Sequence, residues 1–262
     1  MSDWRALDQE LDAWGRGRDV ATLWWRDDDA VAATPALQRL LALTHEAGKP
    51  PIPLCLAVVP AGAMASLPGL LSPLDHVSVL QHGYTHVNHG SDGAKKAEFP
   101  AGRDLTEMLA DLRTGRKRLL ELFKEQALPA LVPPWNRIAP ALVDRLPEVD
   151  LVGLSTYGPR RHDGSKAAVI EVNTHIDIMN WHSGRRFLGV DAALKLAIDH
   201  LAARRQNRVE KNEATGLLTH HLVHDDEAWV FIDTFLRRTV RHAAVRWLDG
   251  RALFDRPDEA RR

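Results

Sequence analysis

The order of apolar and polar segments along the chain constrains its fold more than any other feature. Short apolar runs end in polar clusters, and an amphipathic helical pattern follows most of them. This order predicts about seven strands, at 20–25, 52–59, 77–80, 130–132, 151–156, 169–172 and 217–220. Strands that alternate with helices form parallel sheets. The sequence therefore predicts an α/β fold, either a wound parallel sheet or a (β/α) barrel.

Helical segments lie between these strands and also precede the first of them. Residues 3–14 carry apolar side chains at helical spacing, and Thr34 with Pro35 provides an N-cap and a first-turn residue for the next helix. Further helices are expected at 103–126, 139–146, 191–204 and 226–242. No internal repeat, linker or low-complexity segment interrupts the pattern. We therefore expect residues 1–262 to form a single domain, which suits the length of an α/β barrel.

The overall charge and the single cysteine argue against several classes of protein. The formal net charge is −1, so no basic field favours nucleic acid or an anionic membrane as a partner. Cys55 lies alone in an apolar run, so it forms no internal disulfide and is expected to be buried and inert. The N-terminal segment lacks a secretory apolar core, and no stretch approaches a membrane span. These features predict a soluble, cytoplasmic protein of undetermined oligomeric state.

The stretch from Val77 to His89, VSVLQHGYTHVNH, is the first candidate for a functional site. A short apolar run of the kind found in buried parallel strands leads into His82 and His86. Their spacing lets two imidazoles turn onto one metal ion, and Gly83 permits a sharp turn after the strand. The alternative is a polar loop with unrelated histidines, since the chain contains 13 of them.

Three consecutive carboxylates, those of Asp27, Asp28 and Asp29, follow the first expected strand. Adjacent carboxylates repel one another unless a cationic group lies among them, and Arg26 immediately precedes these three. One interpretation is a solvated turn whose aspartates cap the next helix. The position directly after a strand favours a functional site instead, because α/β folds place their active sites at strand ends.

Further polar clusters follow three later strands. In a (β/α) barrel the carboxyl ends of all strands form one face, so clusters far apart in sequence would converge there. Trp135 either lines a pocket on that face or packs in the core. The clusters contain Pro133, Pro134, Trp135, Asn136 and Arg137, then Asp177 and Trp181, and finally His220, His221 and His224.

Five short motifs, RDDDA at 26–30, HGYTH at 82–86, PPWN at 133–136, DIMNW at 177–181 and LLTHH at 217–221, occur in this order. The set resembles the polysaccharide deacetylase superfamily, the NodB-homology or carbohydrate esterase family 4 fold. The resemblance extends from residue 20 to about residue 225, and HGYTH is its most specific motif. It implies a distorted (β/α)7–8, TIM-like barrel.

The resemblance also implies roles for individual residues. The family's first motif pairs a general base with a metal ligand, and we assign these roles to Asp28 and Asp29 because Arg26 and Ala30 then flank the pair. Asp27 and Asp28 are the alternative pair. The second motif implies His82 and His86 as the other metal ligands. The last motif implies His220 as the catalytic acid, on the same strand face as Leu218, whereas His221 points away or replaces it.

Two motifs depart from the family pattern. The arginine that usually opens the third motif and supports the base is missing, and Val132 stands near its place. Arg26 and Arg137 are the candidates to replace it. Asn180 stands where the fourth motif usually has a second aspartate, while Asp177 remains available to orient an imidazole. Residues expected to support the site or bind substrate are Arg26, Asp27, His89, Trp135, Asn136, Arg137, Asp177, Trp181 and His221.

The resemblance implies a metal-dependent deacetylase that hydrolyses an N-acyl amide, such as an N-acetyl group, of a sugar, a glycan or a related small molecule. One carboxylate and two imidazoles suit Zn²⁺, and Co²⁺, Ni²⁺ or Fe²⁺ can bind the same ligands. A cytoplasmic location favours a soluble glycan or a small amide as substrate. The altered motifs leave two alternatives, a non-catalytic barrel that binds a glycan or another partner and an esterase with the same metal site.

Overall fold

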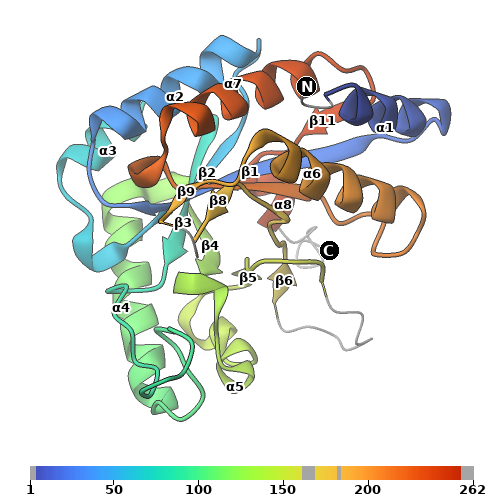
Figure 1. Ribbon diagram of the computed structural model, residues 1–262. Helices are drawn as coiled ribbons and strands as arrows, with labels where there is room; N and C mark the ends of the chain where they lie inside the picture. Colours follow the sequence, from blue (N-terminus) through green and yellow to red (C-terminus); the bar gives the residue numbers. More distant parts are fainter. Residues whose placement is uncertain (1–3, 161–168, 182–183, 255–262) are drawn as a thin grey trace, which may run out of the picture.

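The structure is a computed structural model that describes residues 4–160, 169–181 and 184–254. Its centre is a curved sheet of parallel strands with helices on the outside (Figure 1). The strand order is β6-β5-β4-β3-β2-β1-β10-β7, and β11 pairs with the start of β1. These strands are β1 (Ala21–Ala30), β2 (Leu54–Val58), β3 (Val77–His82), β4 (Ala127–Val132), β5 (Gly153–Leu154), β6 (Ile170–Glu171), β7 (Ile176–Asp177), β10 (Thr215–Thr219) and β11 (Val245–Trp247).

The helices cover the outer face of the sheet. Helix α1 packs on α6, and α2 packs on α7 (Figure 1). A short antiparallel pair, β8 (Met179–Asn180) and β9 (Arg186–Phe187), follows β7. The helices are α1 (Trp4–Arg16), α2 (Pro35–Ala47), α3 (Ser66–Leu71), α4 (Leu105–Phe123), α5 (Pro140–Val143), α6 (Val190–Arg205), α7 (Asp226–Val240) and α8 (Gly250–Phe254).

The predicted α/β barrel class is confirmed. Strands β6 and β7 form the two edges of the sheet. A parallel bridge between Tyr157 and Thr174 links the segment after β5 to the segment between β6 and β7. The curvature brings distant strands together across the interior, where the Trp24 indole donates a hydrogen bond of 3.0 Å to the carbonyl of Asn173. That the whole chain forms one domain stays a prediction.

Two elements differ from the sequence-based expectation. Strand β1 continues through the three aspartates to Ala30, although a loop was expected after Trp25. The expected helix at 139–146 is only four residues long, and a 3-10 helix at Leu146–Val149 follows it. Pro147 explains the second difference, because it has no N–H to donate to the carbonyl of Val143 and its ring would clash with that carbonyl in a continued α-helix. Part of the polar loop expected at 158–166 lies outside the described residues.

The alternation of side chains along β1 decides which residues face the barrel interior. Leu23 and Trp25 pack with the helices in the outer core, whereas Trp24 packs inside with side chains of β2, β3 and β4. Arg26 and Asp28 continue the inward series beyond Trp24. The strand therefore directs these two residues toward the centre of the barrel.

The chain after β11 closes the barrel at the amino ends of the strands. Phe254 of α8 is buried and meets the Trp24 ring edge to face at 6.2 Å. Cys55 lies in the same inner cluster, and burial raises the pKa of its thiol to about 12, so the expectation of a buried, inert thiol is confirmed. Among the described residues, no helix is long and apolar enough to cross a membrane.

Candidate metal and catalytic site

Three side chains converge at the carboxyl ends of β1 and β3, two strands that flank β2 in the sheet. One oxygen of Asp29, Oδ1, lies 3.0 Å from His82 Nε2 and 3.2 Å from His86 Nε2. His82 is buried, while Asp29 and His86 are partly exposed. The structure thus brings together the three residues that the motifs imply as metal ligands.

The donor set of Asp29, His82 and His86 fits a divalent metal ion. Tetrahedral coordination with bonds of about 2.0–2.2 Å places ligand atoms roughly 3.4 Å apart, close to the separations found here. His82 Nδ1 donates a hydrogen bond of 3.0 Å to the carbonyl of Val132, which leaves Nε2 of the neutral ring as the metal-binding atom. The residues present therefore suit Zn²⁺ and related ions.

Two of the three candidate ligands and two residues near them have unusual backbone conformations. Asp29 has φ 70° within a register shift of β1, and this turn brings its carboxylate to the same region as that of Asp28. His86 has φ 60°, while Trp135 and Asn136 have φ 57° and 55°. Each such non-glycine conformation costs on the order of 1 kcal/mol or more and persists where surrounding contacts enforce it.

The charges at the site favour ion pairing in the metal-free protein. Burial alone would raise the pKa of Asp29, but hydrogen bonds from His82 and His86 outweigh burial and hold this pKa well below its usual range. Burial would lower the pKa of His82, but its bond to Asp29 and the charges of Asp28 and Asp29 raise it. A bound cation would replace the proton that His82 Nε2 shares with Asp29.

Asp28 is held by an arginine from its own strand. Arg26 is fully buried, with Nε 2.9 Å from Asp28 Oδ1 and one terminal nitrogen 3.0 Å from Asp28 Oδ2. The same guanidinium donates to Asn136 Oδ1 at 2.7 Å and, across the barrel, to Ser155 Oγ at 2.7 Å. Of the two arginines considered for the missing third-motif arginine, Arg26 is therefore the one that contacts Asp28.

His220 lies on the other side of Asp28, at the end of β10. Its Nε2 is 3.9 Å from Asp28 Oδ2, and its ring meets Trp181 edge to face at 4.6 Å. The Trp181 indole donates a hydrogen bond of 2.8 Å to Asp177 Oδ2. Burial raises the pKa of Asp177, although the nearby His220 opposes this effect. Trp181 thus packs against the His220 ring and is itself held by Asp177.

His221 and Asp27 form a separate pair on the outer face of the sheet. His221 Nδ1 lies 2.5 Å from Asp27 Oδ1, and both side chains are buried. The Thr219 hydroxyl and the backbone N–H of His221 donate to Asp27 Oδ2 at 2.7 and 3.0 Å. Asp27 contacts neither His82 nor His86, so the geometry favours Asp28 and Asp29 as the functional pair.

Of the remaining residues predicted for the site, Trp135 lies beside the candidate metal ligands, whereas Arg137 and His89 do not contact them. The Trp135 ring packs on His86 with centroids 4.5 Å apart, so it lines the metal-ligand group rather than the core. Arg137 donates to the carbonyl of Lys96 and not to Asp28. His89 is exposed, and among the described residues its side chain makes no hydrogen bond or ion pair with the ligand group.

Two residues at the site carry no clear sequence signal. Ser155 follows β5 and accepts the hydrogen bond from Arg26. Glu98 lies in the segment 90–102, where turn-forming residues predict a loop, and it is nevertheless completely buried. A single serine at the end of a predicted strand and a single glutamate in a predicted loop give no pattern that points to a site, so only the tertiary fold reveals these contacts.

A second group, His175, His200 and Glu213, is also close enough to suggest a metal site. The backbone N–H of Gly216 donates to His175 Nδ1 at 3.0 Å, so the neutral ring carries its proton on Nε2, the atom that faces Glu213. Burial, together with the positive charges of Arg204 and Arg160, lowers the pKa of His175 to about 3. This group therefore fits a buried polar cluster and does not fit a metal.

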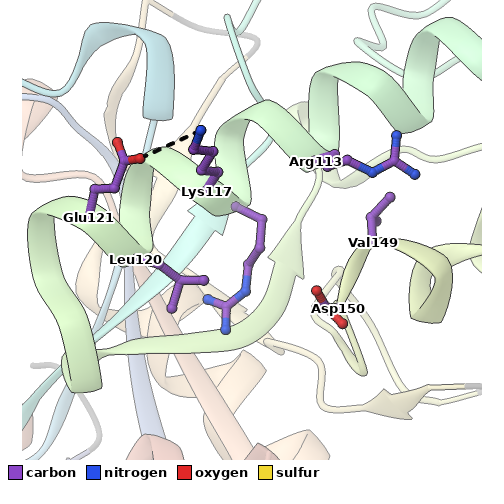
Figure 2. A pocket seen from close by; sticks show the side chains of 7 residues that line it. Arg113, Lys117, Leu120, Glu121, Val149 and Asp150 are labelled. Carbon is purple, nitrogen blue, oxygen red and sulfur yellow. Dashed lines mark ion pairs between the residues drawn. The ribbon is translucent and has the colours of Figure 1, made fainter.

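A surface hollow of about 360 Å³ lies on the far side of the barrel from the ligand group. Helix α4 contributes Arg113, Lys117, Leu120 and Glu121, and Asp150 lies opposite them (Figure 2). Asp150 precedes β5, so this hollow is at the amino ends of the strands. Three basic and two acidic side chains line it, and it shares no residue with the candidate site.

Several solved structures share this fold. A protein from Mycobacterium smegmatis classed as a polysaccharide deacetylase matches with a TM-score of 0.65 and 16% identity, over 89% of this chain and 88% of that chain. A family 4 acetyl xylan esterase from Clostridium thermocellum, in complex with a cobalt ion, matches with a TM-score of 0.51 and 12% identity, over 88% and 89%. The Xyl-CE4 domain of a multidomain xylanase from the hindgut metagenome of Trinervitermes trinervoides gives 0.53 and 8%, over 90% of each chain.

These likenesses define the class of fold. The chain has the α/β barrel fold of the polysaccharide deacetylases and of carbohydrate esterase family 4, so the resemblance inferred from the five motifs is confirmed for the fold. No protein-family model and no curated protein matches the sequence.

Proposed function

We propose that this protein is a metal-dependent deacetylase that removes an acetyl group from the nitrogen of a sugar, a glycan or a related small molecule. The arrangement of Asp29, His82 and His86 beside Asp28 carries this proposal. Two imidazoles and one carboxylate are the ligand type of hydrolytic metal sites that keep a position for water and substrate. Zn²⁺ suits these donors, and Co²⁺, which one structural neighbour contains, suits them also.

A divalent metal bound by Asp29, His82 and His86 would supply Lewis-acid activation of water and of the acyl carbonyl. Asp28 is the general base, which accepts the proton of the attacking water on its carboxylate. Arg26 holds that carboxylate in place with contacts to both oxygens. Because Arg26 is itself fixed by Asn136 and Ser155, Asp28 has little freedom to turn away.

His220 is the general acid, which donates a proton from Nε2 to the departing amine. This nitrogen lies 3.9 Å from Asp28 Oδ2, so the acid and the base are close enough to contact the same reacting group. Trp181, which is held by Asp177, packs against the His220 ring and limits its rotation. The products are acetate and a free amine, with one water consumed.

The structural neighbours support an acetylated carbohydrate as the substrate class. One is classed as a polysaccharide deacetylase, and another is an acetyl xylan esterase. The second neighbour favours an alternative, in which the same site cleaves an acetyl ester. A cytoplasmic location, which stays a prediction, favours a soluble glycan or a small amide over a cell-wall polymer.

Acetate release from a set of paired substrates tests the proposed function. The purified protein, loaded with Zn²⁺ or Co²⁺, is incubated with N-acetylated chito-oligosaccharides and, separately, with acetylated xylo-oligosaccharides. We expect acetate from the N-acetylated series, its loss with a chelator, and its recovery when metal is restored. Acetate from the xylo-oligosaccharides alone would favour the esterase. Release that a chelator does not affect would contradict the metal-dependent mechanism.

A further inference from the structure

Glu98 is a buried carboxylate that none of the proposed catalytic steps uses. It lies in the segment between β3 and α4, and its side chain points into the turn that connects His82 and His86. Its neighbour Phe99 is also buried and forms a parallel bridge with Ile138, which anchors the segment beside the chain that follows β4. The carboxylate is thus held by a firmly packed part of the fold.

Within the described residues, the hydrogen bonds of the Glu98 carboxylate all go to the turn that carries the two histidines. Oε1 accepts from the Thr85 backbone N–H at 2.7 Å and from the Thr85 hydroxyl at 3.0 Å. The Tyr84 backbone N–H lies 3.2 Å from both oxygens. A Cβ atom at Gly83 would approach Glu98 Oε2 to 2.0 Å, so this close contact also explains the glycine of the motif.

The negative charge of Glu98 has no cationic partner among the described residues. A buried carboxylate is costly unless hydrogen bonds or a nearby positive charge compensate it. Here the compensation comes from three N–H and O–H groups of the turn between the two histidines. A cation held by His82 and His86 would add the missing positive charge on the other side of that turn.

We propose that Glu98 is a positioning residue for the metal site, which fixes the His82–His86 turn and stabilises the bound cation by its charge. The inference rests on the proposed metal-dependent function and adds a residue outside the motifs. Carboxylates that orient metal ligands from outside the coordination sphere typically change metal affinity by about 10- to 100-fold when mutated. Glu98 would orient the two histidines through hydrogen bonds to the backbone of the turn between them, instead of through a hydrogen bond to an imidazole.

The Glu98→Gln variant tests this role through metal affinity, measured for Zn²⁺ by competition with a chromogenic chelator. The substitution keeps the shape of the side chain but removes the charge and turns one acceptor into a donor that faces N–H groups. We expect Zn²⁺ binding about 10- to 100-fold weaker than in the wild type. The His220 and Asp28 side chains are unaltered, and the readout does not depend on turnover.

Glu213→Gln is the matched control. Glu213 is also buried and accepts hydrogen bonds from a backbone N–H, that of Arg160, but it belongs to the cluster that does not fit a metal. Both variants should lose stability in the metal-free state, and only Glu98→Gln should lose Zn²⁺ affinity. Equal affinities in Glu98→Gln and the wild type would overturn the role of Glu98 while leaving the metal site intact.

If Glu98→Gln does not fold, a less disruptive variant tests the same role. Thr85→Val removes only the hydroxyl that donates to Glu98 Oε1 and leaves the carboxylate in place. It should weaken Zn²⁺ binding in the same direction by a smaller factor, and unchanged affinity in this folded variant would then overturn the inference. Absence of Zn²⁺ binding by the wild type would overturn both this inference and the proposed function.

Discussion

Arg26 and Asp28, two residues apart on β1, form a buried ion pair inside the barrel. The guanidinium contacts both carboxylate oxygens, at 2.9 and 3.0 Å, and both side chains are almost completely inaccessible to solvent. The alternation of the strand places both on the inner face, so the arginine that supports the proposed base comes from the same short motif as the base. This local pair takes the structural place of the arginine that the third motif lacks.

Replacement of Arg26 should therefore reduce catalysis and stability together. In Arg26→Gln the buried Asp28 carboxylate loses its partner, which costs on the order of 3–5 kcal/mol of unfolding free energy. We expect kcat/KM of the remaining folded protein to fall by about 100-fold or more, because a misplaced base loses most of its effect. Acetate release and urea unfolding measure the two effects.

Arg204→Gln provides the comparison for Arg26. Arg204 is equally buried, but it donates to Thr22, Thr215 and Lys211 and not to Asp28. Its replacement should cost a similar free energy of unfolding and change kcat/KM of the folded fraction far less. Equal losses of kcat/KM in both variants would mean that Arg26 acts only through stability.

Asp28→Asn and Asp29→Asn should separate the base from the metal ligand. Asp28→Asn keeps the ligand group and removes the base, so we expect kcat to fall by about 10²- to 10⁴-fold with metal content unchanged. Asp29→Asn removes the anionic ligand, so metal content and activity should fall together. Elemental analysis and acetate release on the same samples decide between them, and the reverse pattern would support the other assignment of the aspartates.

His220→Ala and His221→Ala should also differ, although the two histidines are adjacent. His220 faces Asp28, and its loss should reduce kcat by about 10²- to 10⁴-fold with little change in stability. His221 pairs with buried Asp27, so its loss should cost on the order of 3 kcal/mol of unfolding free energy. Kinetics combined with thermal unfolding test this difference between the two variants. A larger loss of kcat in His221→Ala than in His220→Ala would show that His221 is the acid.

Much of this arrangement was predictable from local patterns. Strand and helix periodicity predicted the order of elements, and the spacing of His82 and His86 predicted that these two side chains lie close together, where they meet Asp29. The strand period of two correctly placed His220 and His221 on opposite faces. These features are local, because residues within a few positions of one another determine them.

The remaining features depend on tertiary contacts. The sequence offered both Arg26 and Arg137 as partners for the base, and only the path of β1 shows that Arg26 reaches Asp28. The backbone turn at Asp29 departs from strand alternation and lets the adjacent carboxylates of Asp28 and Asp29 both reach the candidate site. No sequence pattern predicts this turn. The role of Glu98 could not be predicted for a similar reason. Its burial depends on how the segment between β3 and α4 folds back on the turn between His82 and His86.

The cluster around His200 should make the protein sensitive to acid. Burial, followed by the charge of neighbouring His175, lowers the pKa of His200 from 6.5 to about 3. Below pH 6.5 the unfolded chain binds a proton that the folded protein does not, so this contribution to stability is complete above pH 6.5 and declines toward pH 3. Each such histidine contributes a slope of about 1.4 kcal/mol per pH unit within this window.

Urea unfolding of the wild type and of His200→Gln at several pH values measures this contribution. The variant lacks the titrating ring, so its unfolding free energy should decline less steeply than that of the wild type between pH 6.5 and 4. Parallel curves for the two proteins would show that His200 is protonated equally in the folded and unfolded states.

The metal content of the purified protein shows whether Asp29, His82 and His86 form a metal site. Protein prepared without added metal is measured by elemental analysis, beside a variant that carries His82→Ala and His86→Ala. We predict about one equivalent of a divalent transition metal in the wild type and its loss in the double variant. Wild-type protein that takes up no metal even after Zn²⁺ is added, or a double variant that retains the full equivalent, would contradict the account.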